Sequence, residues 1–259
     1  MRKFLVMCLC VLVAGVTVFT FTGCGKKDDT LRFACYGYEY PVTYYDSNNH
    51  LAGIESDLGA VFGQKMNKKV TYDVMDWQSL FVAVDSGTHD LVVGLTITDD
   101  RKVNNDFTQP IADVGLMFIA KADDTSLDGK TAAEIEAAMN GKKVGTILGS
   151  AHDDYLETIP GITCVNYENT GLMAIALQAG LIDYFMWEYT MSEQTGKVIK
   201  DPTLFGTNPN IKLIETPMKV DQIGIMVKKG NTKLLNQLND ILTEIKADGK
   251  MEQIITKYV

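Results

Sequence analysis

One stretch of the sequence decides the fold: residues 76–101, DWQSLFVAVDSGTHDLVVGLTITDDR. Its first half places apolar residues such as Leu80 and Val84 at helical spacing, and Gly87 follows them as a helix stop. Residues 91–93, Leu-Val-Val, are typical of a strand that is buried on both faces. The stretch therefore predicts a helix that leads into a buried strand.

The residues upstream continue this alternation. Residues 31–35 form an apolar, strand-like run, residues 44–53 resemble a hairpin, residues 54–62 have helical spacing and residues 70–74 alternate as a strand. The resulting order is β-α-β-α-β. This order predicts an α/β fold whose sheet is mainly parallel and is covered by helices.

The same order of elements begins again after residue 142, with strands and helices expected at residues 144–148, 150–158, 163–167 and 172–177. A local repeat supports the duplication. Residues 87–93 and 180–186 both contain Gly-x-x-Asp followed by an apolar strand. We therefore expect two similar lobes, each a mainly parallel sheet flanked by helices.

Two strand-like runs, residues 115–120 and 222–227, lack helices of their own. We interpret them as two crossings between the lobes, one outward and one returning. The first lobe then comprises residues 31–114 plus 219–259, and the second comprises residues 115–218. Apolar stripes in the last 30 residues predict two closing helices.

The N-terminus has the pattern of an export signal. Arg2 and Lys3 precede a long apolar run, which ends in Phe-Thr-Gly-Cys at residues 21–24. These four residues resemble the lipobox of bacterial lipoproteins, which implies cleavage before Cys24 and attachment of lipid to its sulfur. We expect a signal peptide at 1–23 and a lipidated tether at 24–30. The alternative is an uncleaved transmembrane anchor; either way the folded part lies outside the cytoplasmic membrane.

The charge and the cysteines narrow the classes of function. The 259 residues carry a net charge of −9, and the 236 that follow the leader carry −11, because the leader contains only two bases. No basic stripe is present, so nucleic acid is not an expected partner. Besides Cys24, the mature chain has only Cys35 and Cys164, which we interpret as small buried thiols.

The usual motifs of catalysis, phosphate binding and metal binding are missing from the sequence. The three histidines, at positions 50, 89 and 152, are scattered, and we interpret them as surface residues. We therefore expect a protein that is not an enzyme and that has no cofactor and no metal site.

The residues that follow the buried strands carry the candidate chemistry. Ligands of open α/β sheets bind beyond the carboxyl ends of such strands. In the first lobe these positions hold Gly94 and Thr96, and in the second they hold Trp187 and Glu188. Arg101 follows in a short helix, and its guanidinium fork suits a carboxylate. The alternative is an exposed Arg101 paired with a neighbouring aspartate.

Segments 76–80, 86–90 and 96–101 together look like the signature of the family 3 extracellular solute-binding proteins, the amino-acid receptors of ABC importers. Further matches lie at 107–110, 141–145 and 246–258, so the resemblance covers essentially the whole mature chain. It implies a two-lobe periplasmic-binding-protein-like fold of type II, which closes on a ligand in the cleft.

The resemblance also implies roles for first-lobe residues. Arg101 would clamp the ligand α-carboxylate, with Thr96 and the region of Gly94 completing these contacts. Trp77 stands where the family places a ring that stacks on the ligand side chain, unless it is a core aromatic. The resemblance implies a second aromatic ring that pairs with Trp77 and comes from residues 36–40, and we expect it to be Tyr40.

In the second lobe, Gly149-Ser150 resembles a turn whose N–H groups at a helix start add to carboxylate binding. Ala151 replaces the hydroxyl residue of the family there. Glu188 stands in place of an aspartate that takes the ligand α-ammonium, and it reaches one methylene further. The alternative for Glu188 is an acidic residue in a first helical turn, stabilised by the helix dipole.

These features lead to one expected function and two alternatives. We expect a monomeric lipoprotein, extracytoplasmic and anchored to the outer face of the cytoplasmic membrane at the cell surface or in the periplasm. It would capture a small amino acid or related carboxylate and deliver it to a membrane permease. The first alternative is a cyclohexadienyl or arogenate dehydratase of the same fold, with Glu188 as general acid. The second is a signalling sensor.

Overall fold

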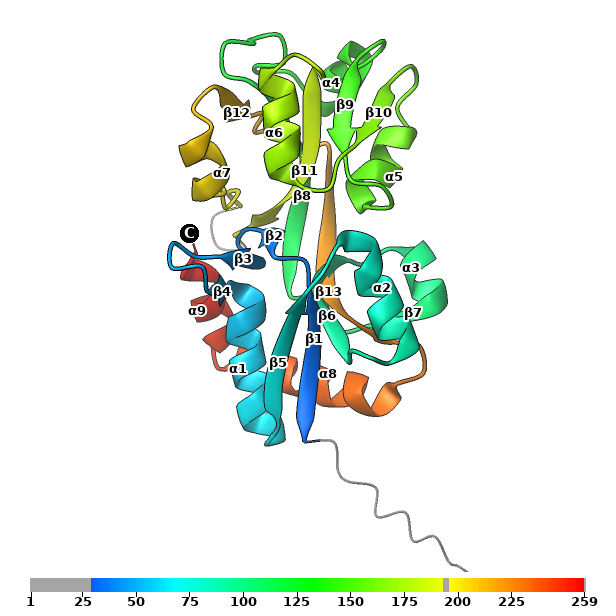
Figure 1. Cartoon of the computed structure of the whole chain (residues 1–259), viewed down its shortest axis with the longest axis vertical. Helices are drawn as coiled ribbons and strands as arrows, with labels where there is room; N and C mark the ends of the chain where they lie inside the picture. The colour runs from blue at the N-terminus through cyan, green and yellow to red at the C-terminus, as the bar shows by residue number, and fades with distance from the viewer. Residues whose placement is uncertain (1–28, 193–195, 259) are drawn as a thin grey trace, which may run out of the picture.

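The structure is a computed structural model, which describes residues 29–192 and 196–258 (Figure 1). The predicted signal peptide, the lipid attachment at Cys24 and most of the tether lie outside the described residues. None of the helices in this described part is long and apolar enough to cross a membrane.

The predicted strands and helices occur in the predicted order. The strands are β1 (Thr30–Cys35), β2 (Tyr38–Glu39), β3 (Thr43–Tyr45), β4 (Leu51–Ala52), β5 (Lys69–Val74), β6 (Leu91–Thr96), β7 (Asn105–Phe107), β8 (Ala112–Lys121), β9 (Lys143–Thr146), β10 (Thr163–Asn166), β11 (Tyr184–Met191), β12 (Ile211–Leu213) and β13 (Lys219–Lys228). The helices are α1 (Ile54–Met66), α2 (Trp77–Ser86), α3 (Asp99–Asn104), α4 (Ala132–Ala138), α5 (Ala151–Glu157), α6 (Thr170–Gln178), α7 (Pro202–Thr207), α8 (Thr232–Ala247) and α9 (Lys250–Thr256). Of these elements, β2, β7, α4, α7 and β12 are additional to the predicted ones.

One curled sheet runs through the described molecule, in the order β10-β9-β11-β8-β13-β6-β1-β5. Strands β8 and β13 lie side by side between two groups of elements (Figure 1). The lower lobe in that view contains β1–β7, α1–α3, α8 and α9, and the upper lobe contains β9–β12 and α4–α7. The predicted crossings, residues 115–120 and 222–227, lie within β8 and β13.

The sheet is mixed, so the expectation of a mainly parallel sheet holds only for its outer parts. Strand β1 pairs in parallel with β5 and β6, and β9 pairs in parallel with β10 and β11. Strands β8 and β13 are antiparallel to each other, because the chain leaves the lower lobe on one and returns on the other. Their outer neighbours β11 and β6 are antiparallel to them as well.

The repeated Gly-x-x-Asp segments make the same contacts in both lobes. Asp90 donates its N–H to the carbonyl of Arg32, and its carboxylate accepts the N–H of Arg32 at 2.8 Å. Asp183 exchanges the same two bonds with Lys143, again with 2.8 Å to the carboxylate. Each aspartate thus ties the start of its own strand to the neighbouring parallel strand.

The buried apolar residues form three clusters. The first packs α1, α8 and α9 against the lower sheet, and the third lies within the upper lobe. The second extends across both lobes, from Tyr36 and Trp77 to Ile147 and Trp187. The two lobes are therefore in contact through apolar side chains as well as through β8 and β13. Cys35 is a buried free thiol, as predicted, whereas Cys164 is a free thiol that is only half-buried.

Candidate functional site

The predicted site residues meet where β6 of the lower lobe faces β11 of the upper lobe. Gly94 and Thr96 belong to β6, and Trp187 and Glu188 belong to β11. The prediction that these residues follow the ends of their strands is wrong. Strand β11 continues to Met191 because it pairs with β8 beyond the point where its pairing with β9 stops.

A small, partly enclosed cavity lies between the lobes. Its volume is about 10 Å³, and it is lined by Glu39, Trp77, Gly94, Ile147, Ser150, His152, Trp187 and Glu188. One water molecule needs about 10–15 Å³ of such space. An organic ligand therefore fits only after the lobes have moved apart.

Glu188 connects the two lobes. It is 8% exposed, it accepts a hydrogen bond from the Thr96 hydroxyl, and one of its oxygens lies 3.6 Å from Nδ1 of His152. Burial acts to raise the pKa of Glu188, but the neighbouring His152, Thr96 and Arg101 outweigh burial and hold that pKa below its usual value. Glu188 is therefore an ionised carboxylate at neutral pH. It lies on a strand, so the alternative of a first-turn helical residue does not apply.

Arg101 approaches the same region from the short helix α3, which Thr98 caps by accepting the Arg101 N–H. Its guanidinium donates to the carbonyl of Thr96 at 2.9 Å and to the carbonyl of Gly149 in the upper lobe at 3.4 Å. It also lies 5.6 Å from the ring centroid of Trp77.

The alternative of a surface Arg101 paired with an aspartate is not what the structure shows. Asp99 pairs instead with Lys102, and Asp106 pairs with Lys229.

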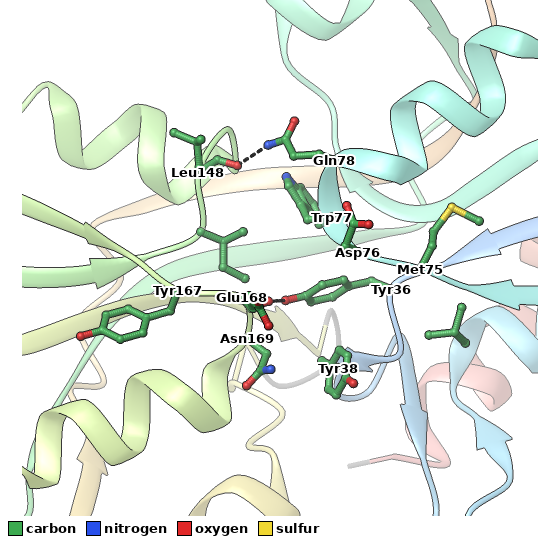
Figure 2. A pocket seen from close by; sticks show the side chains of 12 residues that line it. Tyr36, Tyr38, Met75, Asp76, Trp77, Gln78, Leu148, Tyr167, Glu168 and Asn169 are labelled. Atoms are coloured by element: carbon green, nitrogen blue, oxygen red, sulfur yellow. Dashed lines mark hydrogen bonds between the residues drawn. The ribbon is translucent and has the colours of Figure 1, made fainter.

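Further polar bonds join the lobes around the cavity. The indole N–H of Trp77 donates to the carbonyl of Gly149 at 3.3 Å, and the Gln78 side chain donates to the carbonyl of Leu148 at 2.7 Å. The Tyr36 hydroxyl donates to the carbonyl of Glu168. Figure 2 shows these side chains on the wall of an open groove of about 600 Å³, which shares Trp77 with the small cavity.

Within residues 36–40, Tyr36 and not the predicted Tyr40 lies beside Trp77. The rings of Tyr36 and Trp77 meet edge to face with centroids 5.6 Å apart. Tyr40 instead packs against Tyr44 with the two rings tilted, and its hydroxyl donates to the carbonyl of Tyr258. Tyr36 directly follows β1, so the rule that selected residues at the ends of strands would have found it.

In this conformation the N–H groups of the predicted anion-binding turn, Gly149-Ser150, are hydrogen-bonded to nearby residues of the same lobe. Ser150 caps α5 by accepting the Asp153 N–H, and its own N–H donates to the carbonyl of Ile147. The N–H of Gly149 donates to the Asp153 carboxylate at 2.9 Å. The Gly149 carbonyl, in contrast, faces Trp77 and Arg101.

Three residues that line the cavity were not predicted: the apolar Ile147 and the ionisable His152 and Glu39. His152, interpreted as a surface residue, is 2% exposed and lies against Glu188 and the ring of Trp187, so that interpretation is wrong. Its position two residues after the helix cap turns it inward, toward the cleft. Glu39 is 9% exposed and also lines the cavity. The pattern around Glu39 carries no signal that distinguishes it from an exposed loop acid.

Comparison with known proteins gives a consistent result. The family model for bacterial extracellular solute-binding proteins, family 3, matches residues 31–259. The L-cystine-binding protein TcyJ of Escherichia coli (strain K12) is 24% identical over 254 residues, covering 95% of this chain and 91% of that protein. The ABC transporter arginine-binding protein 1 of Escherichia coli (strain K12) is 26% identical over 259 residues, covering 95% of this chain and 98% of that protein.

A solved structure of an ancestral arginine-binding protein bound to arginine shares the fold, with a TM-score of 0.76 and 28% identity. The match covers 89% of this chain and 98% of that one. The family match spans both lobes and both crossing strands. The chain therefore belongs to the bacterial extracellular solute-binding proteins of family 3.

Proposed function

We propose that this protein captures a small amino acid or related carboxylate between its lobes and delivers it to the permease of an ABC importer. The lobes would comprise residues 31–114 plus 219–259 and residues 115–218. The observation that carries the proposal is that two opposite charges from opposite lobes lie close together at the cleft. Glu188 of the upper lobe lines the cavity, and Arg101 of the lower lobe lies beside it, against the Trp77 ring and the Gly149 carbonyl.

Each end of a zwitterion has a partner in this arrangement. The Arg101 guanidinium now donates to two neutral carbonyls, and a ligand carboxylate is a stronger acceptor for the same N–H groups. Glu188 accepts from the Thr96 hydroxyl, and a ligand ammonium would add a charged donor. Thr96, Gly94 and Ser150 would surround the ligand backbone.

Closure follows from these contacts. A ligand shifts a conformational equilibrium only through contacts that it makes better in one state. A zwitterion that touches Arg101 on one lobe and Glu188 on the other makes both contacts only when the lobes are closed. The interlobe bonds of Trp77 and Gln78 form in that same closed state. The closed form is then the one that a permease would recognise.

The position in the cell is part of the proposal. We propose cleavage before Cys24, lipid attachment to its sulfur, and a monomer that is anchored to the outer face of the cytoplasmic membrane. Mass spectrometry of the protein from membranes tests this: diacylglyceryl on Cys24 is expected, and a chain that retains residues 1–23 would contradict it.

Calorimetry tests the binding function. Protein that begins at Gly25 is titrated with each of the twenty amino acids, and at least one should bind with micromolar or tighter affinity. Arg101→Ala should abolish this binding while the melting temperature in the absence of ligand stays within a few degrees. If folded Arg101→Ala binds the amino acid with unchanged affinity, the proposed role of Arg101 in binding the ligand carboxylate is wrong.

The dehydratase alternative needs Glu188 as a proton donor. A general acid works best when its pKa lies near the working pH, whereas the pKa of Glu188 lies below its ordinary range. This disfavours the alternative. Incubation with prephenate or arogenate decides between the two, because formation of an aromatic product that Glu188→Gln abolishes would favour the enzyme.

A further inference from the structure

A second carboxylate shares the cavity with Glu188. Glu39 ends the short strand β2, and its side chain lines the same cavity as Glu188, Trp77 and Trp187. It is nine-tenths buried. Within residues 29–192 and 196–258, we find no donor that is hydrogen-bonded to its carboxyl group. Buried polar groups are normally paired, so an unpaired carboxyl group that lines a cavity indicates a missing partner.

Another buried acid of the lower lobe shows the difference. Glu55 on α1 accepts a hydrogen bond from the Thr43 hydroxyl and another from the N–H of Val93 at 3.4 Å. It is therefore satisfied within the protein. Glu39 has no such donors among the described residues and faces the space between the lobes, so a ligand in that space can supply its partner.

The charges around Glu39 define that partner. Burial raises the pKa of Glu39, the carboxylates of Glu188 on β11 and Glu55 on α1 raise it further, and Arg101 on α3 lowers it only in part. A zwitterion without a charged side chain pairs its carboxylate with Arg101 and its ammonium with Glu188, so it has no further positive charge to offer Glu39. With such a ligand, burial and the two neighbouring carboxylates favour the protonated form of Glu39, whereas a second cation on the ligand would favour its ionised form and gain a charge pair.

The surroundings of Glu39 also suit a cation. The indoles of Trp77 and Trp187 line the cavity beside it, and aromatic faces attract ammonium and guanidinium groups. The imidazole of His152 on α5 lines the cavity too, and its Nδ1 lies on the side of Glu188. An anionic ligand side chain would instead meet two carboxylates.

We propose that Glu39 selects ligands with a second positive charge, so that the cleft binds basic amino acids in preference to neutral and acidic ones. The inference rests on the proposed function. In it, the ligand carboxylate meets Arg101, its α-ammonium meets Glu188, and its side-chain cation meets Glu39 beside the two indoles.

The test is calorimetry with five ligands: ornithine, lysine and arginine as basic amino acids, glutamine as a neutral one and glutamate as an acidic one. At least one basic ligand should bind about tenfold or more tighter than glutamine, and glutamate should bind weakest. Glu39→Gln should remove that preference, with the affinity for glutamine changed by about threefold at most. Glu39→Asp, which keeps the charge, should retain it.

Two further variants serve as controls. Glu244→Gln removes an exposed carboxylate on α8, paired with Lys65, and should leave the preference intact. Glu168→Gln tests the mouth of the cleft, because this exposed acid lines the open groove instead of the small cavity. If Glu168→Gln and not Glu39→Gln removes the preference, the inference is wrong.

Other results would also overturn the inference. Glutamine binding as tightly as every basic ligand contradicts it, and so does an equal loss for all ligands in Glu39→Gln. The absence of binding by any amino acid is a different result, because it removes the proposed function itself.

Discussion

Glu188→Gln is the substitution that probes the site most sharply. The side chain keeps its size and one oxygen acceptor but loses its negative charge. In the structure this charge is 8% exposed and lies beside the Thr96 hydroxyl and His152, so solvent screens it poorly. If the ligand ammonium binds here, the substitution removes a desolvated charge pair.

The expected magnitude follows from this burial. Truncating one partner of a buried, hydrogen-bonded charge pair costs about 2–5 kcal/mol. The amide of glutamine retains an acceptor, so the lower part of that range applies, about 2–3 kcal/mol. This corresponds to a Kd that is roughly 30- to 150-fold weaker.

The assay is a double cycle in calorimetry. The best-binding amino acid and the same molecule without its α-amino group are each titrated into the original protein and into Glu188→Gln. The α-amino group should contribute about 2–3 kcal/mol to binding by the original protein and much less to binding by the variant. Circular dichroism and the melting temperature without ligand establish that the variant is folded.

The reasoning is refuted if the α-amino group contributes equally to binding in both proteins. It is also refuted if Glu188→Gln leaves Kd within about threefold of the original value.

Three other perturbations follow from the geometry. Gly94 has φ +85°, and a Cβ there would lie 2.3 Å from Val42 Cγ1, so Gly94→Ala should cost about 2 kcal/mol and lower the melting temperature by roughly 4–8 °C. An unchanged melting temperature would contradict the clash, and Val42→Ala should restore part of the loss. Burial raises the pKa of Glu55 to about 7, although hydrogen bonds partly offset this, so folding stability should fall between pH 4.5 and 7 by about 3 kcal/mol on account of this group. Glu55→Gln should remove about 3 kcal/mol of the loss in unfolding free energy between pH 4.5 and 7, as measured by urea unfolding, and an unaltered loss would show that Glu55 titrates normally. Tyr36→Phe removes the interlobe bond to the Glu168 carbonyl and keeps the ring, so Kd should weaken about 2- to 10-fold, whereas unchanged or tighter binding would mean that this bond does not form in the closed complex.

Local patterns were sufficient to predict most elements of the fold. Helices α1 and α2 and strands β1, β5 and β6 lie where spacing and glycine stops placed them. The Gly-x-x-Asp repeat identified the duplication because each aspartate makes the same two bonds to a neighbouring strand. The outward and returning crossings were predicted, but their pairing as neighbouring antiparallel strands was not, since β8 and β13 lie far apart in the sequence.

The site was predicted only in part, because some of its residues are marked by local patterns and others are not. Arg101, Thr96 and Glu188 carry chemistry next to buried strands, so both pattern and resemblance point to them. His152 and Glu39 line the cavity only because distant segments meet there. Spacing along the chain contains no information about which face of the opposite lobe a side chain will meet.

A crystal structure of the complex with the best-binding amino acid tests the central claim most directly. The account predicts electron density for the ligand between the lobes, with its carboxylate within hydrogen-bonding distance of the Arg101 guanidinium and its α-ammonium within that distance of the Glu188 carboxylate. Density elsewhere, such as in the separate groove beside Tyr40 and Asp201, or a ligand in the cleft that touches neither Arg101 nor Glu188, would contradict it.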